Sequence, residues 1–122
     1  MKKRTGIKRI LFAFKYSFNG FIVTFRTQEA FRQDVLVFVV LFPVVFILNI
    51  LVVQRLILIS SLFGILIAEL TNTAIEVCIN RISGKRHTFS KVAKDIGSCI
   101  VLISFLYLIT VWSIVLWENF LK

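Results

Sequence analysis

Four polar residues on one helical face, inside a long apolar run, constrain the fold of this chain more than any other feature. The run from Leu56 to Asn80 is otherwise almost wholly apolar, and its length fits a transmembrane helix. It is interrupted at positions i, i+3, i+4 and i+7 by Glu69, Asn72, Thr73 and Glu76. Such spacing puts all four on one stripe of a helix. A carboxylate at bilayer depth costs about 2.5–3.5 kcal/mol even on insertion scales, so the stripe is expected to face a polar site. The alternative is a pair of structural carboxylates satisfied by a neighbouring helix, although helix packing uses Ser, Thr or Gly more often.

Composition supports a membrane protein with a single domain, residues 1–122. Hydrophobic residues make up 58% of the 122 residues, which is typical of this class. The formal net charge of +9 does not indicate a nucleic-acid partner, because no soluble basic domain is left once the apolar runs are removed. Basic residues beside apolar runs instead report membrane topology and contact with anionic lipids.

The periodicity predicts one surface helix and three membrane spans. Residues 7–31 place apolar side chains three and four positions apart, which predicts an amphipathic helix lying in the membrane interface. Long apolar runs predict transmembrane helices over 35–53, 56–80 and 96–117. The connection between the first two is reduced to Gln54-Arg55, so these spans are expected to be antiparallel.

The distribution of basic residues predicts the orientation. Eight Lys or Arg residues lie in positions 1–34 and five in 81–95, against one in the turn at 54–55 and one in the tail. The positive-inside rule therefore places the N-terminus and the 81–95 loop in the cytoplasm. Glu76, Lys94 and Asp95 would then gather at the cytoplasmic surface, with Glu69 about 10 Å deeper at 1.5 Å per residue.

The residues at this surface suit phosphoryl transfer to a lipid hydroxyl. Carboxylate and amide oxygens suit Mg²⁺, which commonly bridges to phosphate. The loop at 83–87 offers Lys85, Arg86 and His87 to a polyphosphate. Glu69 is placed to accept a proton from an alcohol presented from within the bilayer. The sequence has no Walker motif and no kinase Gly-rich loop, so a nucleotide site would be non-standard. A proton- or ion-coupled transporter subunit and an oligomeric structural protein remain open.

Several strings along the chain form a specific combination. They are Ala30-Phe31-Arg32-Gln33, Glu69-Leu70-x-Asn72-x-Ala74-Ile75-Glu76, Arg81-Ile82, and Ala93-Lys94-Asp95-x-Gly97-Ser98, together with Arg9 and Tyr16. Across essentially the whole chain, this combination resembles the prokaryotic integral-membrane diacylglycerol kinases. The resemblance implies an all-α integral membrane protein of the bacterial inner (cytoplasmic) membrane. Each subunit would have three transmembrane helices and one amphipathic surface helix, in a homotrimer with shared sites. It also implies direct transfer of the γ-phosphate of MgATP to diacylglycerol, giving phosphatidic acid.

The same resemblance implies residue roles. Glu69 resembles the general base, with Asn72 beside it, and Glu76 resembles a metal and nucleotide ligand. The other nucleotide contacts would be Arg9, Tyr16, His87, Lys94 and Asp95. The lipid contacts would be Arg9, Ala30, Phe31, Arg32, Gln33, Arg55, Glu69, Ser98 and Trp112. Each of three positions also has a simpler interpretation: a solvated loop residue for His87, a solvated turn residue for Arg55, and an interfacial belt residue for Trp112.

One position departs from the family pattern. The family usually has a metal-binding Glu three residues before the Phe of its Ala-Phe-Arg-Gln string, but here that position is Gln28 and the carboxylate follows at Glu29. One residue turns a helix by about 100°, so Glu29 cannot simply replace its neighbour. Either the first helix ends early and Glu29 reaches the metal, or Gln28 is a neutral ligand, or the metal site is weakened. We favour Glu29 as the ligand.

Two alternative functions remain after the resemblance is considered. The sibling activity in the same family is phosphorylation of undecaprenol, but the Ala-Phe-Arg-Gln string and the Trp-containing third span resemble the diacylglycerol branch more closely. A transporter or proton channel would use Glu69 and Glu76 as a relay. Both acids lie toward one end of the span, which leaves the outer half of the bilayer without a relay group.

Overall fold

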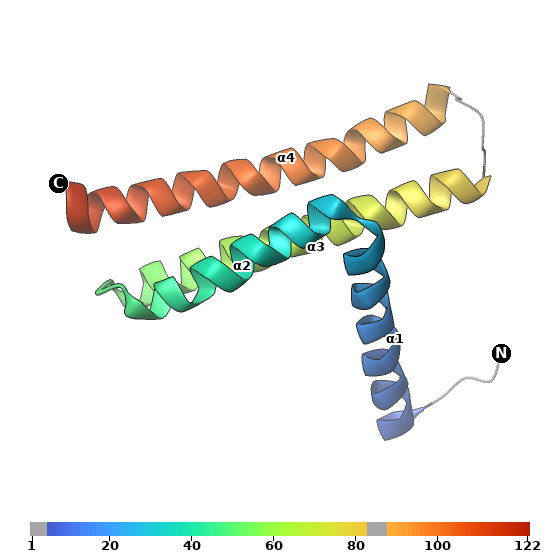
Figure 1. Ribbon diagram of the computed structural model, residues 1–122, viewed down its shortest axis with the longest axis horizontal. Coiled ribbons are helices and arrows are strands. Elements are labelled where there is room, and N and C mark those ends of the chain that lie inside the picture. The colour runs from blue at the N-terminus through green and yellow to red at the C-terminus, as the bar shows by residue number, and fades with distance from the viewer. Residues whose placement is uncertain (1–4, 83–87) are drawn as a thin grey trace.

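The computed structural model describes residues 5–82 and 88–122, and this part of the chain contains helices and no strands. The helices are α1 (Gly6–Thr27), α2 (Glu29–Ile47), α3 (Val52–Ile82) and α4 (Thr88–Leu116), which continues into a short π-helical turn, η1 (Trp117–Leu121). α2, α3 and α4 run roughly alongside one another, whereas α1 projects sideways from the beginning of α2 (Figure 1). The prediction of an all-α fold is confirmed.

Three of the helices are long and apolar enough to cross a membrane: α2, α3 and the α4–η1 helix. Many of their large apolar side chains are exposed in the single chain, as expected for helices that lipid surrounds. The three predicted spans are therefore present. The predicted boundaries differ from the observed ones, chiefly because α3 and α4 extend into the segment expected to be a loop at 81–95.

The buried core lies where α2, α3 and α4 meet, away from α1. It consists of Val45, Leu58, Leu62, Ile65, Leu108, Trp112 and Val115. Within it, the indole Nε1 of Trp112 donates a hydrogen bond of 3.1 Å to Ser61 Oγ, and Ser61 in turn donates to the Leu58 carbonyl oxygen at 2.6 Å. α3 makes its largest interface with α4, and α1 contacts α2. This core fixes α3 against α4 and so fixes the polar stripe of α3.

A sharp break at Gln28 separates α1 from α2, so the helix predicted over 7–31 ends at Thr27. Gln28 has extended backbone angles, φ −117° and ψ 110°. The Arg32 guanidinium stabilises the break by donating to the carbonyl oxygens of Phe25 (2.8 Å) and Arg26 (3.0 Å), which lack partners within their own helix. Phe31 is fully buried and packs edge-on against Phe21, with ring centroids 5.1 Å apart. Contacts between residues six to ten positions apart thus hold this bend at Gln28, the elbow between α1 and α2, and helical periodicity alone does not reveal it.

The connection between the first two spans lies at 48–51, not at Gln54-Arg55, since α2 ends at Ile47 and α3 begins at Val52. Arg55 belongs to α3, and its guanidinium donates to the carbonyl oxygens of Val45 (3.0 Å) and Leu48 (2.9 Å). It therefore caps the C-terminal end of α2. The sequence prediction misplaced this connection because the residues from 48 to 53 are nearly all apolar, and an apolar run carries no local signal for where a helix stops.

Candidate active site

The polar stripe of α3 is present as predicted and points largely into the protein. Glu69 is 6% exposed, Asn72 9% and Thr73 8%, while Glu76 is half-buried. The Thr73 hydroxyl donates to the carbonyl oxygen of Glu69 at 2.9 Å, so it is satisfied within its own helix. The two carboxylates and the amide are left as the reactive part of the stripe.

Asn72 lies between the two carboxylates. Its amide nitrogen donates a long hydrogen bond of 3.5 Å to Glu76 Oε1, and its side chain also interacts with Glu69. Its amide oxygen Oδ1 is buried and accepts no hydrogen bond from the described residues. That oxygen lies directly against Gly97 of α4, where a Cβ atom would collide with it. The close approach of α3 and α4 at Gly97 therefore sets the orientation of the amide.

A third carboxylate, Asp34 of α2, lies near this site, and the sequence analysis did not single it out as a site residue. Asp34 is only 4% exposed, and the Glu69 carboxylate acts on it electrostatically. Asp34 directly follows Arg32-Gln33, so its place in the chain does not distinguish it from the polar segment that precedes the first span. A signal was available in its position immediately before Val35, because Asp34 belongs to the same continuous helix as the apolar run that follows it.

The first turn of α2 and the end of the stripe lie at similar levels. α2 and α3 are antiparallel in Figure 1, and Asp34 of α2 is near enough to Glu69 of α3 for the Glu69 carboxylate to act on it electrostatically. Glu29 lies five residues before Asp34, about 7.5 Å along α2, and Glu76 lies seven residues after Glu69, about 10.5 Å along α3. Both displacements run in the same direction. The two other predicted metal ligands, Glu29 and Gln28, therefore lie at the same end of the site as Glu76. Glu29 is exposed and Gln28 is half-buried.

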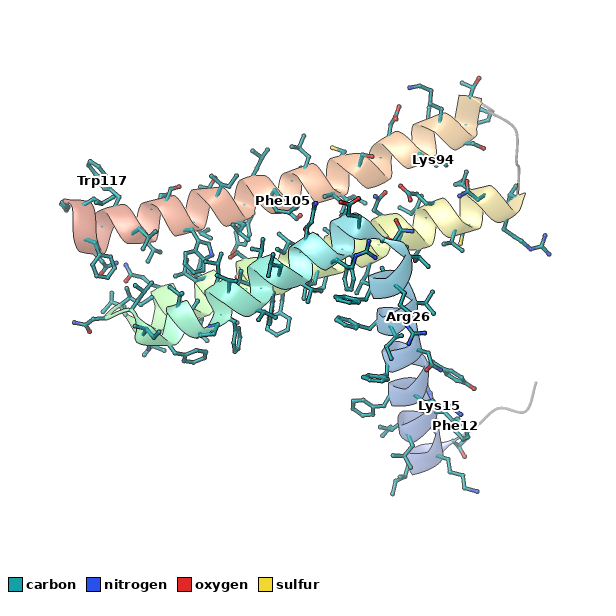
Figure 2. All side chains as sticks on the ribbon, in the orientation of Figure 1. Phe12, Lys15, Arg26, Lys94, Phe105 and Trp117 are labelled. Atoms are coloured by element: carbon teal, nitrogen blue, oxygen red, sulfur yellow. The ribbon has the colours of Figure 1, made fainter. Side chains whose placement is uncertain are left out.

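Two predicted nucleotide contacts, Lys94 and Asp95, lie on α4. Lys94 Nζ donates to Asn80 Oδ1 at 2.9 Å, which links the two helices. Asp95 instead forms an exposed ion pair of 2.7 Å with Lys91, one turn earlier on its own helix. Figure 2 shows Lys94 on the stretch of α4 that faces the final turns of α3. The predicted contacts Lys85, Arg86 and His87 lie outside the described residues.

The remaining predicted contacts are spread more widely. Arg9 and Tyr16 are exposed on α1, which projects away from the α3 stripe in the single chain (Figure 1). Ala30, Gln33 and Ser98 are exposed near the elbow and on α4. Arg55 and the buried Trp112 lie toward the other end of α3, where both make the structural contacts described above. The single chain thus brings together Glu69, Asn72, Glu76 and the α4 residues, but not the α1 residues.

The donor chemistry at Glu76 fits a divalent cation. The described hydrogen bond to its carboxylate is a single long one, so it retains lone pairs for a hard cation. The described residues contain no group of three His, Cys, Asp or Glu side chains that could hold a metal. That does not count against Mg²⁺, which usually binds proteins through one or two carboxylates and completes its shell with water and substrate phosphates.

Three apolar helices of spanning length, with a cluster of buried and half-buried carboxylates between them, define an integral membrane protein with a polar site inside its helical bundle. A family model described as prokaryotic diacylglycerol kinase matches residues 15–116. The chain belongs to this family and is therefore a kinase, which confirms the resemblance and the prediction of an enzyme. Membership also implies that a divalent metal is used with ATP.

Individual relatives agree with the family model. The chain is 44% identical to a diacylglycerol kinase of Pseudomonas aeruginosa, over 94% of this chain and 94% of the relative. It is 35% identical to a diacylglycerol kinase of Escherichia coli over 95% of each chain. It is 34% identical to one from Haemophilus influenzae, over 93% of this chain and 96% of the relative. These matches cover nearly the full length of each protein, so the likeness extends over α1 as well as α2, α3 and α4.

Proposed function

We propose that this protein transfers the γ-phosphate of ATP directly to the hydroxyl of diacylglycerol, giving phosphatidic acid and ADP. The observation that carries the proposal is the buried Glu69 carboxylate, which lies on α3 between Asp34 and Asn72 within a membrane-spanning helix. A carboxylate in that position is costly, and proton transfer from a lipid hydroxyl gives it a use. The relatives named above carry the same activity in their names.

Glu69 is the general base in this proposal. It accepts the hydroxyl proton as the lipid oxygen forms its bond to the γ-phosphorus and the bond from that phosphorus to the β–γ bridging oxygen breaks. Asn72 keeps Glu69 and Glu76 apart and orients both carboxylates. The three spans hold these groups on rigid helices, which favours a reproducible geometry for the in-line attack.

Mg²⁺ is the metal we propose, bound with ATP, where it would neutralise charge on the β- and γ-phosphates. Glu76 would hold it, together with Glu29 or, failing that, Gln28 at the elbow. Lys94 and Asp95, with Glu76, would contact the nucleotide at the end of α4 that faces Asn80. Lys85, Arg86 and His87 of the connecting loop would supply further contacts to the phosphates.

The helix lengths support a site at the edge of the bilayer. α3 has 31 residues, about 46 Å at 1.5 Å per residue, whereas the hydrocarbon core is about 30 Å thick. Measured from Val52, Glu69 lies about 26 Å along the helix and Glu76 about 36 Å along it. A lipid headgroup can therefore meet Glu69 while a water-soluble nucleotide meets Glu76. By the positive-inside rule this end is cytoplasmic, in the inner membrane of a bacterium.

A homotrimer with shared sites completes the proposal. Arg9 and Tyr16 lie on α1, away from the stripe of their own chain, so they would contact substrates at a neighbouring subunit's site. The exposed apolar side chains of α1, including Ile10, Phe14 and Phe18, suit a helix lying in the membrane interface. Arg9 and the exposed residues Ala30, Arg32 and Gln33 would then meet the lipid headgroup there, with Ser98 and, more distantly, Trp112 and Arg55 along the lipid. Phe31, which the resemblance also assigns to the lipid, is fully buried against Phe21 and is left out of this proposal.

The test is phosphate transfer from γ-labelled ATP to diacylglycerol and to undecaprenol in mixed micelles. We expect labelled phosphatidic acid from the wild type and a loss of at least about 100-fold in kcat for Glu69→Gln, the range that general-base catalysis contributes. Glu118→Gln is the matched control, because Glu118 is an exposed acid of η1, paired with Lys122 and far from Glu69 along the α4–η1 helix. Product with undecaprenol alone would move the protein to the sibling activity. Full activity of Glu69→Gln would refute the assigned base.

A further inference from the structure

Asn80 extends the polar stripe of α3 by one further turn. It lies four residues after Glu76 and two residues before the end of α3 at Ile82, so it shares the helical face of Glu76 about 6 Å farther along the axis. Its side chain ends in an amide, which accepts hydrogen bonds without carrying charge. The roles proposed for Glu69, Asn72 and Glu76 do not involve this amide.

The Asn80 amide holds a cation that comes from the neighbouring helix. Lys94 Nζ of α4 donates to Asn80 Oδ1 at 2.9 Å, on the stretch of α4 that faces the final turns of α3 (Figure 2). The two residues are 14 positions apart in the sequence, so no periodicity within one helix predicts their contact. The packing of α3 against α4 therefore gives Lys94 a fixed partner.

Lys94 keeps its charge in this contact. Among the described residues, the ion pairs are Lys91 with Asp95 and Lys122 with Glu118. No described carboxylate therefore pairs with Lys94. An ammonium group has three N–H donors, and the amide oxygen uses one of them. The neutral acceptor thus fixes the position of the ammonium while it leaves both the charge and two donors for another ligand.

Two contacts between α3 and α4 lie on either side of Glu76. Four residues before Glu76, Asn72 lies against Gly97 of α4. Four residues after it, Asn80 accepts the hydrogen bond from Lys94. The ammonium is therefore held at the same end of the stripe as the carboxylate proposed to hold the metal. A metal ion and an ammonium that bind different oxygens of one ligand are the combination that suits a polyphosphate.

We propose that Asn80 is a positioning residue that holds the Lys94 ammonium ready for the phosphates of ATP. A lysine ammonium sits on a flexible four-carbon stem, and without a fixed partner it would sample many positions beside α3. The Asn80 oxygen removes that freedom before the nucleotide binds, which reduces the entropy lost on binding. The two remaining donors of Lys94 then bind the triphosphate, and Asn80 itself touches no substrate atom.

This inference rests on the proposed function, because it requires Lys94 to contact ATP. The first experiment therefore measures binding without phosphate transfer, by calorimetric titration of the magnesium complex of β,γ-methylene-ATP into the full-length protein in micelles. Asn80→Ala removes the acceptor, whereas Asn80→Asp keeps an acceptor oxygen on a side chain of the same length. We expect Kd to rise at least fivefold in Asn80→Ala and to stay within threefold of the wild type in Asn80→Asp.

Asn49→Ala is the matched control for this titration. Asn49 is an exposed asparagine in the connection between α2 and α3, at the opposite end of α3 from Asn80. Its substitution should leave Kd within twofold of the wild type. Equal Kd values for the wild type and Asn80→Ala would overturn the proposal, as would a wild type that binds no analogue. A wild type that binds the analogue but phosphorylates neither lipid would refute the proposed reaction, and the Kd values would still decide the positioning role.

A double-mutant cycle tests whether Asn80 acts through Lys94. In a Lys94→Met background the amide has no ammonium to hold, so Asn80→Ala should weaken binding by less than twofold more. A further fivefold loss in that background would show that Asn80 acts independently of Lys94 and would overturn the proposal.

Steady-state kinetics separate positioning from a merely structural role. Asn80→Ala should raise KM for MgATP at least fivefold and leave KM for diacylglycerol within twofold, because Lys94 contacts the nucleotide and not the lipid. The hydrogen bond is exposed, so its loss should leave the unfolding temperature nearly unchanged. An equal rise in both KM values, or a loss of binding matched by a loss of thermal stability, would overturn the positioning role.

Discussion

The amide oxygen of Asn72 on α3 lies against the backbone of Gly97 on α4, so residue 97 cannot carry a side chain without displacing it. Gly97 is buried, and the side chain of Ile75 borders the same space. The amide nitrogen of Asn72 reaches Glu76, and its side chain also interacts with Glu69. The backbone of α4 at Gly97 therefore sets the position of the Asn72 amide, which lies between the Glu69 and Glu76 carboxylates of α3.

Gly97→Ala is expected to lower kcat at least tenfold by pushing the Asn72 amide away from Glu76, since small displacements of catalytic groups have large effects. Gly64→Ala is the matched control, because Gly64 also lies inside a helix and nothing stands within 4 Å of a Cβ built there. It should retain activity and gain about 0.5–1 kcal/mol from better helix propensity. Kinetics and thermal unfolding of both variants in micelles test this, and a fully active Gly97→Ala would contradict it.

The elbow predicts which residue replaces the family's usual metal-binding Glu. Glu29 opens α2 as an exposed carboxylate, whereas Gln28 is the half-buried residue at which the helix breaks. Glu29→Ala should therefore raise the Mg²⁺ concentration needed for half-maximal activity more than Gln28→Ala does, because a carboxylate binds a hard cation more strongly than an amide oxygen. Titration of activity with Mg²⁺ at saturating ATP measures this. The opposite ranking would give the ligand role to Gln28.

The Trp112–Ser61 hydrogen bond predicts an asymmetry between two substitutions. Ser61→Ala leaves the buried indole N–H without an acceptor and should destabilise the protein by about 1–3 kcal/mol. Trp112→Phe removes the donor while Ser61 keeps its bond to Leu58, so the coupling from a double-mutant cycle should be near 0.6 kcal/mol, the average for bonds between membrane helices. Ser104→Ala is the control, since Ser104 bonds the Val101 carbonyl of its own helix. Equal unfolding costs for Ser61→Ala and Ser104→Ala would argue against the interhelical bond.

Two exposed ion pairs, one in the first turns of α4 and one at the C-terminal end of the chain, allow a matched test of the nucleotide site. Lys91 pairs with Asp95, and Lys122 pairs with Glu118 four residues earlier. Neither Lys91→Gln nor Lys122→Gln should change the unfolding free energy by more than about 0.5 kcal/mol. If Asp95 contacts ATP, Lys91→Gln should change KM for MgATP several-fold, whereas Lys122→Gln should leave it unchanged. Identical kinetics for the two variants would remove Asp95 from the nucleotide site.

The polar stripe of α3 could be predicted because it is a local property. A helix converts spacing along the chain directly into a face, so Glu69, Asn72 and Glu76 were placed together from the sequence alone. Their burial followed from the cost of exposing carboxylates to lipid. The same reasoning located three apolar spans, although their ends were displaced where an apolar run carries no stop signal.

The sequence by itself therefore determined the helical class, the number of spans and the acidic face, since each depends on residues within a few turns of one another. Only the tertiary structure brought Asp34 to Glu69, turned the chain at Gln28 and set Gly97 against Asn72. Those relationships join residues far apart in sequence or on different helices. They depend on how side chains pack between helices, and no periodicity within a single helix encodes that packing.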